Sequence, residues 1–336
     1  MQDSIFVPFL WQQEIWQQLT ERHSAGRLPH ALLLSGGNGI GKHHLAKALA
    51  AYLLCRQPGA TACGTCSSCQ LFAAGTHPDL LDILPESEGK QIKIEQVRAL
   101  QAYAGKTAQQ GGFRVVILRP ADAMNQNSAN ALLKNLEEPG QNVLFVLLTH
   151  RNSAVLPTIK SRCQQITLPV PDTELALDWL RGHLESHAAL HAEKLLKMAN
   201  GNPLTAQTLA SDEIHQQRDK LFLTMESLTR GAEPVELAPS FLEGDIHWTL
   251  LWMQQWLADW SNWCVLQQDE QVRFPEMLPL YKHWHKTASL SAAQSLFQTI
   301  GELRSQLASG ANPNIQLAME SLLIRWVDKM LVRSYR

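Results

Sequence analysis

Apolar runs alternate with amphipathic stretches over the first half of the chain. Five runs are rich in Val, Ile and Leu, as expected of strands covered on both faces, and they span residues 31–35, 80–84, 114–118, 143–149 and 164–168. Between them, apolar residues recur at the spacing of a helix over 44–54, 94–103 and 128–138. Strands that alternate with helices in this way predict a parallel α/β sheet.

The pattern changes after Pro169-Val170-Pro171, and no convincing strand follows. Short helices are predicted at 172–184, 189–198 and 203–209, and Gly201-Asn202-Pro203 separates the second from the third. From about residue 212 the apolar spacing is helical throughout. We therefore expect an α/β domain at 1–168, a small helical domain at 169–208 and an all-α domain at 209–336.

Length and charge narrow the possible functions. A chain of 336 residues, 45% of them hydrophobic, has material for two or three domain cores. A dominant nucleic-acid binder usually carries a basic excess, whereas this chain has a net charge of −2, so any DNA contact is expected to be local or shared. No apolar run approaches the roughly 20 residues of a membrane span, and MQDSIFVPFLWQQ is not a secretory signal. We expect a cytoplasmic protein with no membrane partner.

The sequence GGNGIGKH at 36–43 follows the first apolar run and has the layout of a phosphate-binding loop. In such a loop backbone N–H groups surround phosphate oxygens, Lys42 reaches the terminal phosphates, and Gly36 and Gly41 allow the tight backbone path. The last position normally carries a hydroxyl that binds Mg²⁺, but here it is His43, and Mg²⁺ prefers oxygen ligands. Two interpretations stay open: the loop binds ATP, or it retains only its shape.

Hydrolysis also needs carboxylates that hold Mg²⁺ and position water, and these are expected directly after the strand at 114–118. That place is occupied by Arg119 and Pro120, which can do neither. Asp122 lies further on, where we expect the next helix to begin. We therefore predict that this chain does not hydrolyse ATP by itself.

Four of the six cysteines lie close together, at Cys55, Cys63, Cys66 and Cys69. Two-residue separations let one turn direct several sulfurs at one point, and four thiolates complete a tetrahedral zinc site. Because a full set of four ligands leaves no open coordination position, the zinc is expected to be structural. The alternative is a group of buried or redox-active cysteines.

Several other side chains have two interpretations each. Arg162, in Ser161-Arg162-Cys163, is either a solvated arginine or a planar cation that reaches the phosphates of a nucleotide on a neighbouring subunit. Glu137 and Glu138 end a helix at 125–139 and are expected to be solvated rather than catalytic. A stripe of tryptophans is either core or subunit interface, and it consists of Trp248, Trp252, Trp256, Trp260 and Trp263.

Together these features resemble the clamp-loader branch of the AAA+ ATPases. The matching segments cover about the first half of the chain: Pro29-His30-Ala31-Leu32-Leu33, the loop at 36–43, the four cysteines, Gly75-Thr76-His77-Pro78-Asp79, residues 130–139 and Ser161-Arg162-Cys163. The second half matches mainly in its helical character and at 314–326.

The resemblance implies a RecA-like domain with a zinc module, a small helical lid and a helical collar that joins five subunits into an open ring. Such a ring belongs to the bacterial DNA polymerase III holoenzyme and uses ATP to place a sliding clamp on primed DNA. The implied partners are motor subunits (gamma/tau), a delta subunit, the clamp and, through the complex, DNA.

Motor subunits of this family differ from the chain at His43, Arg119 and Pro120, and they carry a lid arginine that the turn at 201–204 lacks. The resemblance therefore implies a non-hydrolysing subunit whose Arg162 acts on a neighbour's ATP, with Ser161 and Cys163 shaping its presentation. Two alternatives remain: an active motor ATPase of the same complex, and a zinc-dependent DNA-binding adaptor outside any ring.

Overall fold

A computed structural model describes residues 4–87, 90–110, 112–308 and 313–331. The chain divides into two compact units, Met1–Gln207 and Thr208–Arg336. Each helix that the structure describes is too short or too polar to cross a membrane.

The first unit is built on a parallel sheet. Its described residues form five strands in the order β2-β3-β4-β1-β5, and these are β1 (Ala31–Ser35), β2 (Leu80–Ile83), β3 (Arg114–Leu118), β4 (Val143–Thr149) and β5 (Gln164–Thr167). The predicted parallel α/β sheet is confirmed, and each strand agrees with its predicted range to within one residue. Every residue of β1, β3 and β4 is buried, which explains their nearly continuous apolar sequences.

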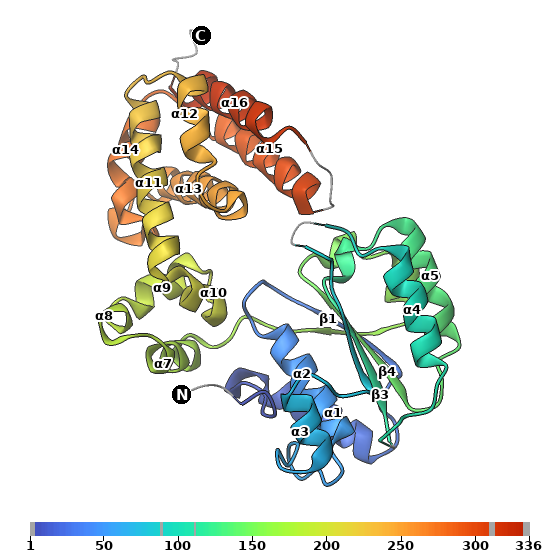
Figure 1. The fold of residues 1–336 in the computed structure, drawn as a ribbon. Coiled ribbons are helices and arrows are strands. Elements are labelled where there is room, and N and C mark those ends of the chain that lie inside the picture. Colours follow the sequence, from blue (N-terminus) through green and yellow to red (C-terminus); the bar gives the residue numbers. More distant parts are fainter. Residues whose placement is uncertain (1–3, 88–89, 111, 309–312, 332–336) are drawn as a thin grey trace. The chain divides into compact units, whose positions relative to one another are not determined.

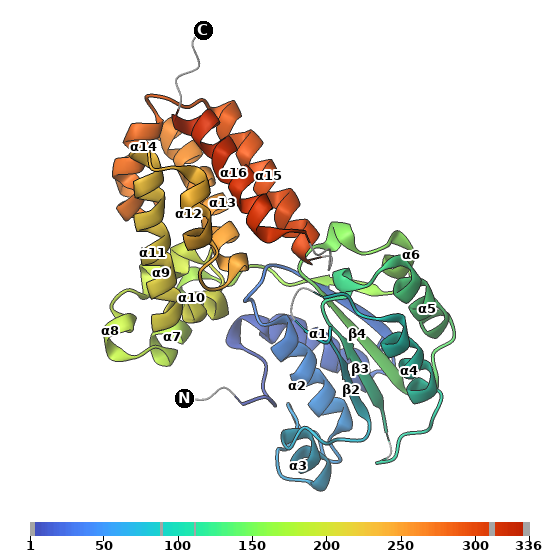
Figure 2. The ribbon, with the colours of Figure 1, turned by 45° about the horizontal axis from the view of Figure 1, so that its top comes forward.

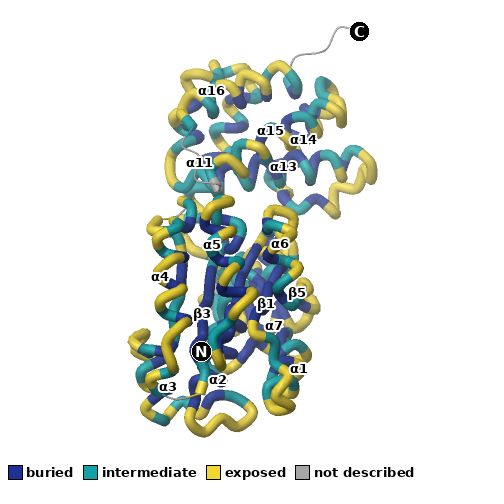
Figure 3. The backbone as a smooth tube through the Cα atoms, turned by 90° about the vertical axis from the view of Figure 1, so that its right-hand side faces the viewer, coloured by how far each residue is buried: buried dark blue, intermediate teal, exposed yellow. Residues whose placement is uncertain are grey.

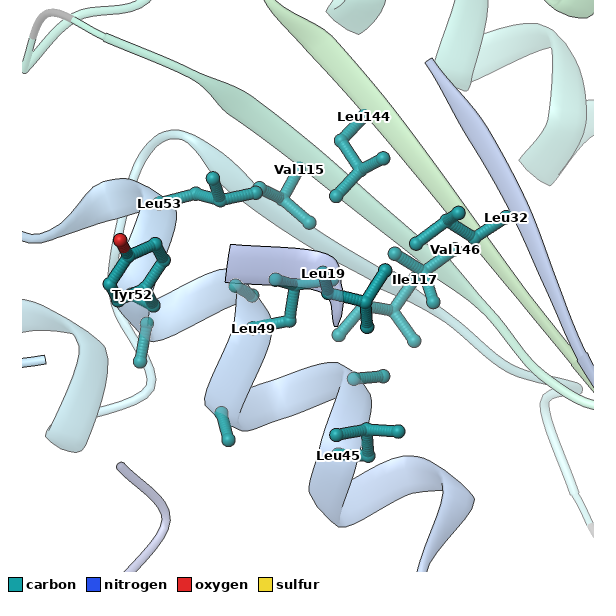
Figure 4. Close-up of a cluster of buried hydrophobic side chains, with 14 of the residues drawn as sticks. Leu19, Leu32, Leu45, Leu49, Tyr52, Leu53, Val115, Ile117, Leu144 and Val146 are labelled. Carbon is teal, nitrogen blue, oxygen red and sulfur yellow. The ribbon is translucent and has the colours of Figure 1, made fainter. Parts of the chain in front are cut away.

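Helices cover both faces of this sheet (Figures 1 and 2). One face carries α1 (Gln13–Ser24), α2 (Lys42–Leu54) and α3 (Ser67–Ala73), and the other carries α4 (Ile94–Ala104), α5 (Gln126–Glu137) and α6 (Pro157–Lys160). Successive strand residues point to opposite faces, so Leu32 packs with Leu45 and Leu49 of α2 (Figure 4), whereas Leu33 belongs to the opposite core. Figure 3 shows the buried strands between helices whose outer sides are exposed.

Four short helices follow the sheet: α7 (Thr173–His183), α8 (Ser186–Ala189), α9 (Ala192–Met198) and α10 (Pro203–Leu209). The helix predicted over 189–198 is confirmed as α9, but it begins at Ala192 rather than Ala189, because the backbone N–H of His191 bonds to the carbonyl of Ala188 at 2.9 Å and turns the chain there. The helix at 203–209 is confirmed, and among the described residues beyond 171 no strand occurs. The domain boundary at 168/169 stays a prediction.

The described part of the second unit is helical. It contains α11 (Asp212–Thr229), α12 (Pro234–Phe241), α13 (Ile246–Leu266), α14 (Leu278–Trp284), α15 (Leu290–Ala308), α16 (Ile315–Trp326) and the π-helical turn Val327–Leu331. Short 3-10 turns complete the chain at Leu10–Gln12, Ala121–Ala123, Asn152–Ala154, Asp269–Gln271 and Pro275–Met277. The core interpretation of the tryptophan stripe fits four of its members, Trp252, Trp256, Trp260 and Trp263, which are buried, whereas Trp248 is half-buried.

Candidate functional site

The phosphate-binding loop joins β1 to α2, which is the strand–loop–helix order that the sequence predicts. Gly41 is the N-cap of α2 with φ 87°, a left-handed conformation that glycine adopts without strain. A Cβ atom at Gly36 would lie 2.4 Å from Ile40 Cδ1 and 2.8 Å from the carbonyl oxygen of Leu168. These glycines are therefore required by the shape of the loop and its packing.

Lys42 is folded into this loop. Only 4% of the residue is exposed, and its Nζ donates to the carbonyl oxygens of Gly36 at 2.8 Å and Gly37 at 2.6 Å. Nζ also lies 2.9 Å from Nδ1 of His150, which follows β4. Desolvation lowers the pKa of Lys42 to about 8, against the opposing effect of the Asp122 charge. The hydrogen bonds of the Lys42 ammonium group are thus made to groups of its own chain.

His43 and Arg119, two of the departures from a motor site, meet at one carboxylate. Asp82 of β2 accepts from Arg119 Nε at 3.1 Å and Nη2 at 3.2 Å, and its Oδ2 lies 3.3 Å from His43 Nε2 and 3.2 Å from Lys47 Nζ. Burial acts to raise the pKa of Asp82, but the hydrogen bonds from His43 and Arg119, together with the charges of Arg119 and Lys47, outweigh it and hold that pKa well below its usual range. Sequence reasoning missed Asp82, whose only signal was an acidic residue inside an apolar run.

Asp122, the nearest acidic residue after β3, serves the fold. It lies in the 3-10 turn Ala121–Ala123 rather than in the next helix, and the peptide bond before Pro120 is cis. Its carboxylate accepts from Thr149 Oγ1 at 2.7 Å and from Arg151 Nε at 3.1 Å. The carboxylate of Asp122 is therefore already hydrogen-bonded to side chains at the end of β4.

The N-terminal segment packs against the far side of the loop. Gln12 Nε2 donates to the carbonyls of Ile40 at 3.1 Å and Gly41 at 3.0 Å, and Trp11 Nε1 donates to Ile40 at 3.0 Å. The ring of Phe9 would lie 2.6 Å from a Cβ at Gly41. Sequence reasoning assigned no role to this segment, although its aromatic residues were a signal.

The first turn of α10 also contacts the loop. The backbone N–H of Leu204 donates to the carbonyl of Gly39 at 3.1 Å, and Thr205 Oγ1 donates to that of Asn38 at 3.2 Å. These are uncharged groups, in the region where the sequence resemblance led us to look for an arginine. The loop is thereby held on both sides by its own chain.

The four cysteines form one cluster after α2. Their sulfur atoms all lie within 4.8 Å of one another, with Sγ separations of 4.0 Å for Cys55–Cys66 and 3.9 Å for Cys63–Cys69. A tetrahedral site with Zn–S bonds of about 2.3 Å has sulfurs about 3.8 Å apart. Backbone N–H groups point at three of these sulfurs at 3.3–3.5 Å. The cluster therefore fits a structural zinc ion.

The Thr-His-Pro-Asp segment anchors this cluster to the sheet. His77 Nε2 lies 2.8 Å from Ser68 Oγ, on the helix that carries Cys69. Buried Asp79 accepts from the backbone N–H groups of Gln109 and Gln110 at 2.8 Å each, and from Arg114 Nε at 3.2 Å. These contacts give the segment a structural role.

Arg162 lies in the short segment between α6 and β5, two residues before the strand begins at Gln164. Because β1 and β5 are parallel neighbours, Arg162 lies at the end of the sheet opposite to the loop that follows β1. Its Nη1 donates to the carbonyl of Thr158 at 3.0 Å and to Ser161 Oγ at 3.3 Å. Cys163 is buried in the core, and burial raises the pKa of its thiol to about 12. The roles predicted for Ser161, Arg162 and Cys163 stay predictions.

Comparisons with known proteins match both units of the chain. Family models described as DNA polymerase III, delta subunit, and as the C terminal part of that subunit match residues 11–172 and 212–328. DNA polymerase III subunit delta' of Pseudomonas aeruginosa is 38% identical over 322 residues, which cover 95% of this chain and 97% of that protein. This chain belongs to the DNA polymerase III subunit delta' family. The delta' subunit of Escherichia coli is 31% identical over 94% of both chains.

The similarity of this delta' family member extends to a second type of subunit. DNA polymerase III subunit tau of Escherichia coli is 32% identical over 227 residues, which cover 67% of this chain and 33% of that protein. Among solved structures, a gamma subunit-related protein of Thermotoga maritima aligns with a TM-score of 0.46 and 20% identity, over 95% of this chain and 99% of that one. The resemblance inferred from sequence motifs is confirmed by the delta' relatives.

Proposed function

We propose that this delta' family member is a non-hydrolysing subunit of a clamp loader, which places a sliding clamp on primed DNA. In this proposal Arg162 acts in trans on the ATP of a neighbouring motor subunit (gamma/tau), and Ser161 and Cys163 shape its presentation. The ring also contains a delta subunit. The observation that carries the proposal is the place of Arg162, at the opposite end of the sheet from the chain's own loop.

The absence of hydrolysis is supported by the groups around the loop. Arg119 and Asp82 form an ion pair where a motor subunit needs a free carboxylate for Mg²⁺, and His43 bonds to the same carboxylate. Lys42 is bonded to the loop's own carbonyls. An active motor is therefore the less favoured alternative, and the net charge of −2 disfavours a DNA-binding adaptor.

The four cysteines are the residues that would hold a structural zinc ion in this subunit. Such an ion would fix the segment between α2 and β2, since two of the sulfurs, those of Cys55 and Cys69, belong to the core beside α2. In this proposal it takes no part in phosphoryl transfer.

The experiment is the ATPase rate of a reconstituted loader with clamp and primed DNA, comparing the native chain with Arg162→Ala and Arg162→Lys. An arginine finger contributes roughly 10³–10⁵ in rate. Because other ATP sites of the ring keep their own arginines, we expect Arg162→Ala to lower the rate of the whole complex by less than this factor, down to the turnover that those other sites sustain. Lysine should not restore it, since it lacks the planar fork of donors.

A matched control is Arg98→Ala, on the exposed side of α4. The control should leave the rate unchanged, and size-exclusion chromatography should show an intact complex for every variant. Isolated chain mixed with ATP and Mg²⁺ should release no phosphate. A full rate with Arg162→Ala would contradict the trans role, and turnover by the isolated chain would favour the motor alternative.

A further inference from the structure

The guanidinium group of Arg162 is engaged by its own chain. Nε donates to Oε1 of Glu137 at 2.8 Å, and Nη2 donates to the same oxygen. Nη1 donates to the carbonyl of Thr158 and to Ser161 Oγ. A side chain proposed to reach into a neighbouring subunit is therefore folded back here by a carboxylate that sequence reasoning had treated as a solvated helix end.

The fold places Glu137 beside Arg162. Glu137 is the last residue of α5, two positions before Pro139. His30 Nε2, directly before β1, lies 2.9 Å from the carbonyl oxygen of Leu136 and links this end of α5 to the sheet. Arg162 follows α6 on the same face of the sheet. The pair thus joins the end of α5 to the segment between α6 and β5.

The geometry of the Arg162–Glu137 ion pair allows another anion to replace Glu137 as the partner of Arg162. Both donors of Arg162 share one oxygen of Glu137, whereas the guanidinium fork binds most strongly to two oxygens at once. The side chains are 34% exposed for Arg162 and 50% for Glu137, so water screens their attraction. The terminal phosphates of a nucleotide offer several oxygens and more than one negative charge, and can therefore replace this single carboxylate oxygen.

We propose that Glu137 is a positioning residue that holds Arg162 in a retracted arrangement and is displaced by the terminal phosphates of a nucleotide on the neighbouring subunit. The inference rests on the proposed trans role of Arg162. Glu137 competes with the nucleotide for Arg162, so Arg162 reaches the nucleotide only after its ion pair with Glu137 is broken. Glu137 touches no reacting group in this scheme and acts only through Arg162.

The test is a double-mutant cycle in the reconstituted loader, with clamp and primed DNA. Glu137→Gln removes the competing charge and keeps the size of the side chain. Glu138→Gln is the matched control, because it removes the same charge from the adjacent exposed residue. Each substitution is made with the native Arg162 and with Arg162→Ala, and the maximal ATPase rate and the ATP concentration at half-maximal rate are measured for each complex.

With the native Arg162, we expect Glu137→Gln to lower the ATP concentration at half-maximal rate by about two- to fivefold, the range that loss of an exposed ion pair produces. The maximal rate should stay within about twofold of the native value. Glu138→Gln should change neither quantity. In the Arg162→Ala background, Glu137→Gln should have no effect, because the residue that it restrains is gone.

Three results would overturn the inference. One is an unchanged half-maximal concentration for Glu137→Gln while Arg162→Ala lowers the rate, which leaves Arg162 as a finger without a restraint. Another is an equal effect of Glu137→Gln in both backgrounds, which places Glu137 in another interaction. The third is a lower maximal rate for Glu137→Gln, which makes Glu137 a support of the engaged arginine. A native rate with Arg162→Ala is a different failure, because it removes the proposed function itself.

Discussion

At the scale of single residues, charged groups around the phosphate-binding loop compensate one another. His43, Lys47 and Arg119 all contact Asp82, so the two side chains that replace metal-binding groups share one internal partner. Lys42, likewise, is held by carbonyls and by a neutral ring nitrogen of His150. The departures from a motor site are therefore built into a network that stabilises the loop without a bound metal.

His150 gives this network a pH dependence. Desolvation and the neighbouring Lys42 charge lower the pKa of His150 to about 4, from an ordinary value of 6.5. The charged ring is therefore disfavoured in the folded state, and its contribution to stability, complete above about pH 6.5, is lost as the pH falls towards about 4. Part of the residue is exposed, so we expect a loss of only about 1 kcal/mol between pH 7 and pH 5.

Urea denaturation at pH 7 and pH 5 measures this loss. The comparison is His150→Asn, whose amide oxygen can accept from Lys42 but does not titrate in this range. The variant should lose about 1 kcal/mol less than the native chain over the same interval. Equal losses for both chains would assign the acid sensitivity to other groups.

The pairings at this scale could not be predicted from the sequence. Asp82 and Arg119 are 37 residues apart, and Glu137 and Arg162 are 25 apart, so their contacts depend on strand order and helix placement. The sequence did identify His43, Arg119 and Arg162 as unusual, because each falls at a defined place beside a strand. The sequence did not reveal which residue each of these three side chains contacts.

At the scale of elements, the strands were predictable because a single requirement, burial on both faces of the sheet, determines their sequences. β1, β3 and β4 are buried on both faces, and that burial produces the unbroken apolar runs. The break between α8 and α9 was not predictable, since the segment around His191 is rich in helix-forming residues and contains neither Gly nor Pro. The cysteine cluster was predictable from its spacing alone, and its geometry fits the expected ligand set.

The cysteine cluster gives the next prediction, for metal content and stability. We expect about one zinc ion per chain, and we expect Cys69→Ser to release it, since this residue is buried in the core beside α2. Loss of a structural zinc removes the main interaction that organises a short segment, so the melting temperature should fall by about 5 °C or more. Elemental analysis and thermal denaturation measure the two quantities.

The matched control is Cys264→Ser in the second unit, outside the cluster. It should retain both the zinc and the native melting temperature. Retention of zinc by Cys69→Ser would show that the metal is held elsewhere or by fewer thiolates.

At the scale of the whole molecule, the two compact units have separate cores. The first unit is organised around the sheet, whereas the second buries large aromatic side chains between helices, among them Trp252, Trp256, Trp260, Trp284 and Trp326. A buried aromatic ring contributes a large apolar area, and several of them can supply a core without help from the sheet. The second unit should therefore be a folding domain in its own right.

This leads to a prediction for residues 208–336 produced alone. The fragment should show helical circular dichroism, tryptophan emission shifted to short wavelength and one cooperative thermal transition, because its core lies within its own boundaries. Trp256→Ala should destabilise it by about 3–5 kcal/mol, since that ring is 1% exposed, whereas Trp248→Ala should cost clearly less because Trp248 is half-buried. A fragment without a cooperative transition would mean that the tryptophan core depends on the first unit. Equal costs at the two positions would contradict the core role of the stripe and return it to the interface interpretation.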